Sequence, residues 1–166
     1  MSFAAAAELK LVQYTQQQRA KLEAYYNAFE PKGAALGLPP RTPEGVHEWI
    51  QSLDKYPSFL ALDGEEIAGH ALLCPETYTG EVAVFVKEGY RGQGIGKRLL
   101  QALIATALEM DLRRIWGITE PDNVPMLRLA HACGFMPGKE MGEFSLDLSN
   151  LRPLPMAHRE AKSKAE

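Results

Sequence analysis

The chain has 166 residues, of which 46% are hydrophobic and 23% are charged, and its formal net charge is −3. This length suits one domain with a buried core, and the composition is that of an ordinary globular protein. The small negative charge argues against general nucleic-acid binding, and no apolar run approaches the roughly 20 residues of a membrane helix.

The first residues and the cysteines bear on where the protein works. Residues 1–7 lack the basic start and the long apolar region of a signal peptide. Cys74 and Cys133 are isolated and form no CxxC pair, which fits two reduced thiols. We therefore expect a cytoplasmic protein. The four histidines show no metal-ligand spacing with Asp, Glu or Cys, so we expect no metal.

The first half of the chain alternates between strand and helix patterns. Thr15 to Gln18 matches a capping box, Pro31 stops the helix that follows, and Thr42-Pro43 opens a second helix. Asp63-Gly64 lies between two apolar runs, which predicts a hairpin. The expected elements are a strand at 8–14, a helix from 15 to about 29, a loop at 31–41, a helix from 42 to before 57, strands at 58–62 and 67–73, and a loop at 74–80.

Residues 81–108 are a strand, a glycine-rich turn and a helix. Val82 to Val86 is a β-branched run typical of a buried strand. Ile95, Leu99, Leu103 and Ala107 recur at a helical interval. The later elements are a strand at 113–119, a loop at 120–123, a helix at 124–133 capped by Gly134, Phe135 in the core, and a strand at 143–148.

The turn between this strand and helix has the physical features of an anion site. Gly92, Gly94 and Gly96 let the backbone turn tightly, and the first N–H groups of the helix have no partner within it. Those groups converge at the positive end of the helix dipole, which favours phosphate, and Arg91 and Lys97 add charge. A glycine turn that opens a helix without a ligand is the alternative.

Two common phosphate-binding motifs fail here. A Walker loop would have glycine where Arg91 stands, and Ser or Thr where Arg98 follows Lys97. A dinucleotide fingerprint would have a third spaced glycine where Leu99 stands. The pattern that fits is R-x-x-G-x-G, from Arg91 to Gly96, after a V-x-V strand that ends at Val86.

This pattern resembles the acyl-CoA pyrophosphate loop of the GNAT (GCN5-related N-acetyltransferase) superfamily. Asn123, Gly134 and Phe135 also match the superfamily pattern N-x(10)-GF, so the resemblance covers about residues 58 to 148. Within the superfamily, the residues around Glu81 to Val84, Asn123 and Gly134 resemble those of one subgroup. That subgroup is the acetyltransferase domain of bacterial Pat-type protein lysine acetyltransferases. The resemblance implies an α/β (α+β) fold: one GNAT-type domain, here residues 1–148, with a mixed central sheet of about six or seven strands flanked by helices. We expect residues 149–166 to be a partly disordered tail, frayed from 159.

The resemblance also implies an acetyl-CoA-dependent N-acetyltransferase that transfers acetyl directly to a primary amine, on a small molecule or a protein lysine. The charge and the lack of a long apolar run argue against a nucleic-acid or membrane partner. The late strands of such folds often pair between subunits, which leaves monomer and homodimer both open. The resemblance places the segment that ends with the helix at 42–57 on the acceptor-binding side, with the acceptor determinants in the loops at 30–57 and 74–80. For any single residue of that segment, a helix pair that only covers the sheet is an equal alternative. The implied cofactor-binding residues are Val84, Phe85, Val86, Arg91, Gly92, Gln93, Gly94, Ile95, Gly96, Lys97 and Asn123.

The chemistry needs a base, because an amine with a pKa of about 10.4 is protonated at neutral pH. The Pat-type resemblance favours Glu81 as that base, with a solvated strand-end glutamate as the alternative, whereas histone-type members would place it at Gly80. The fallback candidates are Glu76, Glu120 and His70.

Two further positions leave alternatives open. Asn123 either contacts the cofactor or caps the last helix. Ala130 stands where many members have a tyrosine that protonates the leaving thiolate, and neighbouring His131 is more typical of a structural or exposed residue. Solvent could supply that proton, since a free thiol has a pKa of about 8.5. The missing tyrosine keeps a second hypothesis open: a non-catalytic acyl-CoA-binding sensor or regulatory module.

Overall fold

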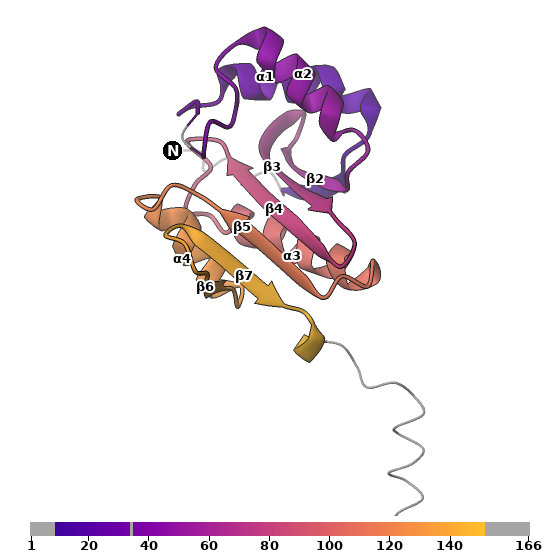
Figure 1. Cartoon of the computed structure of the whole chain (residues 1–166). Helices are drawn as coiled ribbons and strands as arrows, with labels where there is room; N and C mark the ends of the chain where they lie inside the picture. Colours follow the sequence, from indigo (N-terminus) through magenta and orange to yellow (C-terminus); the bar gives the residue numbers. More distant parts are fainter. Residues whose placement is uncertain (1–8, 34, 152–166) are drawn as a thin grey trace, which may run out of the picture.

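The computed structural model describes residues 9–33 and 35–151, which form a mixed sheet with helices on both faces (Figure 1). The strand order is β1-β2-β3-β4-β5-β7-β6. The strands are β1 (Lys10–Gln13), β2 (Ser58–Asp63), β3 (Glu66–Pro75), β4 (Thr79–Val86), β5 (Arg114–Ile118), β6 (Met136–Pro137) and β7 (Glu143–Asp147). The helices are α1 (Arg19–Ala28), α2 (Pro43–Leu53), α3 (Ile95–Glu109) and α4 (Val124–Ala132), with short 3₁₀ turns η1 (Gln16–Gln18) and η2 (Ser149–Leu151).

The sheet confirms the expected mixed α/β architecture. Strands β1 to β4 are antiparallel neighbours, β4 and β5 are parallel, and β5, β7 and β6 are again antiparallel. The strand before the glycine-rich turn, β4, lies at the centre of the sheet, fourth of seven within the described residues. The sequence did not predict β6, which has only two residues and therefore no visible alternation. The expected domain end at residue 148 stays a prediction.

The helix starts follow the capping signals. The Thr15 and Gln18 capping box is present, but it opens the 3₁₀ turn η1, and the α-helix itself begins at Arg19. Thr42 Oγ1 accepts a hydrogen bond from the Gly45 N–H (3.1 Å), with Pro43 in the first turn of α2 as expected. At the other end of α4, Gly134 has a φ of 92°, the left-handed backbone that ends a helix.

The loop expected at 74–80 is wrong in its length. Strand β3 continues to Pro75 and β4 begins at Thr79, so only three residues form the turn. The Glu76 N–H donates to the Thr79 carbonyl (2.8 Å), which extends the antiparallel ladder to the turn itself. Glu81 is therefore the third residue of β4.

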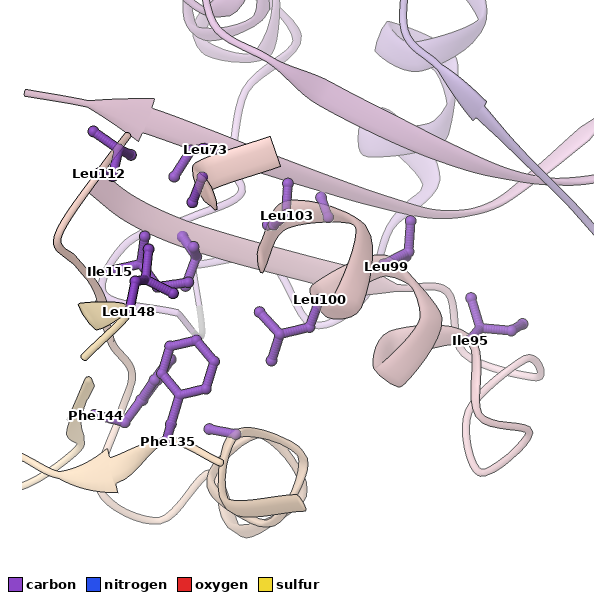
Figure 2. Close-up of a cluster of buried hydrophobic side chains, with 14 of the residues drawn as sticks. Leu73, Ile95, Leu99, Leu100, Leu103, Leu112, Ile115, Phe135, Phe144 and Leu148 are labelled. Atoms are coloured by element: carbon purple, nitrogen blue, oxygen red, sulfur yellow. The ribbon is translucent and has the colours of Figure 1, made fainter. Parts of the chain in front are cut away.

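Two apolar layers cover the two faces of the sheet. On one face α3 and α4 pack on the sheet around residues such as Leu100, Ile115 and Phe135, as Figure 2 shows. On the other face α1 and α2 cover Leu60, Leu72 and Phe85 with an aromatic cluster that includes Tyr26. Because side chains alternate along a strand, the even residues of β4 face α3 and its odd residues face α1.

Strands β4 and β5 separate part of the way along their length. They pair at only three positions, ending at Glu81 opposite Trp116. The next residue of β5, Gly117, lies opposite Phe144 of β7, and a Cβ on Gly117 would stand 2.4 Å from that ring and 3.1 Å from the Val82 carbonyl oxygen. The missing side chain thus leaves room for the Phe144 ring at the point where β4 and β5 diverge.

No helix within the part of the chain that the structure describes is both long and apolar enough to cross a membrane. The sequence-based expectations for residues 1–7 and for the tail beyond 151 lie outside the described residues.

Candidate active site

The glycine-rich turn leaves β4 and enters α3 through left-handed backbone. Gly94 is the N-cap of α3 with a φ of 80°, and Gly92 has a φ of 78°. Residues with a Cβ rarely adopt this conformation, so glycine is needed at both positions. The turn directs the unpaired N–H groups at the start of a 15-residue helix towards one place.

Gly96 has a different reason to be glycine. A Cβ there would stand 2.9 Å from Leu129 of α4, so the first turn of α3 lies directly against α4. This close approach brings the start of α4, including Asn123, beside the glycine-rich turn. Asn123 caps α4, because its Oδ1 accepts from the Met126 N–H (3.4 Å) while its Nδ2 donates to Thr119 Oγ1 (2.9 Å). The capping role left open by the sequence is therefore confirmed.

Arg91 ties the turn to the end of β4 and to the loop that follows α1. Its Nε donates to the Val86 carbonyl (2.9 Å) and one terminal nitrogen donates to the Glu30 carbonyl (3.0 Å). The guanidinium also lies 5.7 Å from the centre of the Phe29 ring. Arg91 thus holds the turn in place with two of its donors, and is less free to bind an anion than its charge alone indicated.

The separation of β4 from β5 leaves backbone groups of β4 facing an open gap. Antiparallel residues alternate between groups directed to the neighbouring strand and groups directed away. The Lys87 N–H donates to the Ala68 carbonyl (2.9 Å), which sets this alternation along β4. The backbone of Phe85 therefore faces His70 of β3, and the backbones of Val84 and Val86 face the gap.

A cavity of about 710 Å³ lies between this edge and the start of α3 and α4. Most of the predicted cofactor-binding residues line it: Val84, Phe85, Val86, Arg91, Gly92, Gly94, Ile95, Gly96, Lys97 and Asn123. Gln93 does not, because its side chain donates to the Gly89 carbonyl (3.3 Å). The charged residues in the lining are Arg91, Lys97 and Arg128, all positive. The size falls within the roughly 300–1,000 Å³ of typical ligand sites.

A smaller cavity of about 190 Å³ lies next to it and contains Glu81 in its wall. The two cavities share six residues: Ala35, Leu38, Val84, Phe85, Asn123 and Met126. Glu81 is an odd residue of β4, so its side chain is on the same face as Phe85. The larger cavity, whose charged residues are all positive, therefore adjoins the smaller cavity, which contains the Glu81 carboxylate.

The surroundings of Glu81 make its carboxyl group a better proton acceptor. Partial burial raises its pKa above the ordinary value, and the nearby Glu76 carboxylate raises the pKa further. Glu81 also lies opposite Cys74 in the β3–β4 pairing. Burial, and to a smaller extent the negative charge of Glu81, raises the pKa of the Cys74 thiol to about 11. A carboxylate with a raised pKa is suited to general base work near neutral pH.

The other candidates for proton transfer lie elsewhere. His70 is 1% exposed, and its Nδ1 is 2.6 Å from the buried Tyr26 hydroxyl. Gly80 is buried on the α3 face, where a Cβ would stand 2.7 Å from Leu73. Glu76 and Glu120 line neither of the two cavities described above.

Ala130, which stands where many superfamily members have the tyrosine, is a residue of α4 buried in the core. His131 is exposed and lines a separate cavity of about 350 Å³ beside β6 and β7. Neither residue reaches the pair of cavities.

Sequence reasoning missed three contributors to the two cavities. Arg128 reaches the larger cavity because α4 packs beside α3, a tertiary contact that leaves no local signal. Tyr90 also lines it, with its hydroxyl donating to Asp63 Oδ2 (2.7 Å). The loop before α2 contributes Leu36 to the smaller cavity; the acceptor determinants were expected within residues 30–57, but no individual residue was singled out there. No group of three or more metal-ligating side chains occurs within residues 9–33 and 35–151.

The chain is similar in sequence to known acetyltransferases. The family model for the acetyltransferase (GNAT) family matches residues 19–135. A putative phosphinothricin acetyltransferase, YwnH, of Bacillus subtilis is 30% identical over 105 residues, which are 58% of this chain and 64% of that relative. The alignment thus spans slightly less than two thirds of the relative's own length.

Solved structures share the fold. The acetyltransferase domain of PAT from S. lividans has a TM-score of 0.71 at 20% identity, covering 84% of this chain and 90% of that one. The putative acetyltransferase yncA of Salmonella typhimurium, solved with acetyl-CoA, has a TM-score of 0.70 at 20% identity, covering 89% and 98%. With the glycine-rich turn, the separated strands and the family match together, the chain belongs to the acetyltransferase (GNAT) family.

Proposed function

We propose that the protein transfers an acetyl group from acetyl-CoA directly to a primary amine, on a small molecule or on a protein lysine. The observation that carries this proposal is the pair of joined cavities, one lined by three cations and one containing Glu81. The first suits the phosphates of the donor and the second suits an ammonium group. Their shared wall at Val84 and Phe85 is where donor and acceptor would meet.

The larger cavity fits the donor in its chemistry. Amides at the start of α3, with Lys97 and Arg128, would hold the diphosphate. The family resemblance suggests that the backbones of Phe85 and Val86 pair with the amide-containing arm of the donor as an added strand does. Because the backbone of Phe85 faces β3, we assign this pairing to Val84 and Val86 instead. The Val86 carbonyl already accepts from Arg91, so its N–H is the free group at that residue.

The donor supplies an activated thioester. In the transfer, the amine nitrogen forms a bond to the carbonyl carbon and the carbon–sulfur bond breaks. Glu81, directly or through a water, accepts the proton that the nitrogen loses. A backbone N–H at the open edge of β4 donates to the carbonyl oxygen as it gains charge. Solvent protonates the departing thiolate, since neither Ala130 nor His131 can do so.

The test compares CoA binding by two glycine variants. Gly94→Val and Gly64→Val both place a side chain on left-handed backbone with open space around the Cβ, so both lose similar stability. Gly64 lies in the β2–β3 hairpin and lines neither cavity. We expect calorimetry to show CoA binding by the native protein and by Gly64→Val, and at least about tenfold weaker binding by Gly94→Val. Equal affinity for CoA in all three proteins would contradict the proposal that the amides at the start of α3 hold the diphosphate.

The buried Ala130 favours one second candidate, a sensor that binds acyl-CoA without turnover. The distinguishing measurement is thiol release from acetyl-CoA with a panel of primary amines. Release that depends on the amine supports the transferase. Tight CoA binding with no release on any amine supports the sensor.

A further inference from the structure

The smaller cavity has a distinctive charge pattern. Of the described residues that line it, Glu81 is the only ionisable one. The neutral polar side chains in the wall, Thr119 and Asn123, are hydrogen-bonded to each other, and Asn123 also caps α4. The rest of the wall is aliphatic or aromatic. An occupant therefore meets one carboxylate and an otherwise apolar surface.

The cations near this region are engaged elsewhere or line the other cavity. Lys55 affects the Cys74 thiol but lies 5.1 Å from the centre of the Tyr56 ring and is not part of the wall. Arg114 pairs with Glu143 (3.4 Å). Arg91, Lys97 and Arg128 line the larger cavity. A carboxylate or phosphate in the smaller cavity would face Glu81 with no cation in the wall to compensate it.

Leu36 adds an unusual apolar element to the same cavity. It lies in the loop before α2 with a φ of 53°, and it is 50% exposed. Left-handed backbone is unfavourable for leucine, and exposure gives its side chain no compensating burial. Glycine or asparagine would suit the backbone better. A leucine here gains its advantage when an apolar group covers it.

We propose that the acceptor is a small primary amine with an uncharged apolar body and no acidic group, bound with its nitrogen towards Glu81 and its body against Leu36. This inference rests on the proposed function, because it names the acceptor class of the same site. It separates this protein from enzymes whose acceptor carries a carboxylate beside the amine. The volume of about 190 Å³ suits a body of a few carbon atoms.

The first experiment uses acceptors matched in shape. Isopentylamine, L-leucinamide and L-leucine share one branched body and differ beside the nitrogen, where leucine alone has a carboxylate. We expect kcat/KM for the first two to exceed that for leucine at least about tenfold, because of like-charge repulsion from Glu81. Amine basicity cannot produce the preference for isopentylamine, since isopentylamine is a stronger base than leucine and therefore has less neutral amine near pH 7. The comparison of isopentylamine with leucine is thus the decisive one. Equal or better use of leucine would overturn the inference.

The second experiment tests Leu36 with a matched control. Leu36→Asn suits left-handed backbone and removes the apolar contact, and Leu151→Asn changes a similarly exposed leucine (52%) in η2 that lines neither cavity. We expect Leu36→Asn to raise KM for isopentylamine about three- to tenfold while leaving KM for ethylamine, which has little body, nearly unchanged. Leu151→Asn should change neither. A uniform change with both amines, or none, would contradict the assigned contact.

Binding measurements keep this inference separate from the proposed function. If no amine supports thiol release, the proposed transferase is wrong, but calorimetry on the CoA-saturated protein still ranks the same three amines. Preference for isopentylamine and leucinamide over leucine in that titration supports the inference. A lysine-containing peptide that is acetylated better than every small amine would overturn the choice of a small acceptor while supporting the transferase.

Discussion

Replacing Glu81 with glutamine removes the proposed base while keeping the size of the side chain. An amine with a pKa of about 10.4 is neutral in only about one molecule in 2,500 at pH 7, which corresponds to about 4.6 kcal/mol. A positioned general base typically contributes about 10²–10⁴-fold. We therefore expect Glu81→Gln to lower kcat/KM for an alkylamine by about 10²–10³-fold near pH 7, with KM for acetyl-CoA little changed.

The pH profile distinguishes loss of a base from general damage. Without Glu81, the reaction depends on amine that is already neutral, so kcat/KM should rise about tenfold per pH unit towards the pKa of the amine. The native enzyme should reach a plateau above the raised pKa of Glu81. A less basic acceptor such as leucinamide, with a pKa near 8, should lose much less activity on substitution.

Glu76→Gln is the control for this experiment. It removes a neighbouring carboxylate from the β3–β4 turn, and should lower the pKa of Glu81 while keeping most of the activity. Stability provides a second readout. A carboxyl group whose pKa is raised by folding favours the folded state at low pH, and this contribution to stability is lost as pH rises through the raised pKa. At a pH above the pKa of Glu81, Glu81→Gln should therefore be no less stable than the native protein. Full activity of Glu81→Gln near pH 7, or a larger loss for Glu76→Gln, would contradict the role of Glu81 as the base.

Two further substitutions test the supports of the site. Arg91→Lys loses the guanidinium that donates to both the Val86 and the Glu30 carbonyl, so we expect about tenfold weaker CoA binding and about 1 kcal/mol lower stability. The control Arg98→Lys loses one hydrogen bond to the Leu9 carbonyl (3.2 Å) and should bind CoA normally. Calorimetry measures the affinity for CoA, and denaturant titration measures the stability. Burial lowers the pKa of His70 to about 3, below its value in the unfolded chain, so stability should fall as pH drops from about 6.5 towards 3, by up to about 1.4 kcal/mol per pH unit. His70→Leu should remove this acid slope in urea titrations, at the cost of an unpaired Tyr26 hydroxyl; an unchanged slope would assign it to other groups.

The sequence predicted the parts of the site that depend on local chemistry. Glycines at Gly92 and Gly94 are required by left-handed backbone, and Asn123, one of whose two expected roles was a helix cap, stands at the start of α4. These signals depend on neighbouring residues, so spacing alone reveals them. The strand and helix patterns around them reflect burial on one face, which periodicity also reveals.

Tertiary placement was the part that local patterns could not provide. Arg91 was expected beside the ligand as a charge, but a carbonyl 61 residues earlier accepts one of its hydrogen bonds. Leu36 comes to the site only because the loop before α2 folds over β4. The register of β3 and β4 decided which backbone groups of β4 face the gap, and a pattern of apolar residues does not fix that register to a single residue.

The Phe144 ring that fits over Gly117 has a consequence for how ligands enter. The ring lies against Gly117 just beyond the last paired residues of β4 and β5, so a side chain of the protein itself shapes part of the recess there. Because β4 and β5 are not paired beyond Glu81 and Trp116, a ligand that enters there breaks no strand pairing, which removes one cost of binding. Filling the space above Gly117 with even a methyl group would displace the ring, and the smaller cavity, which Phe144 lines, would change shape although Glu81 and Leu36 are untouched.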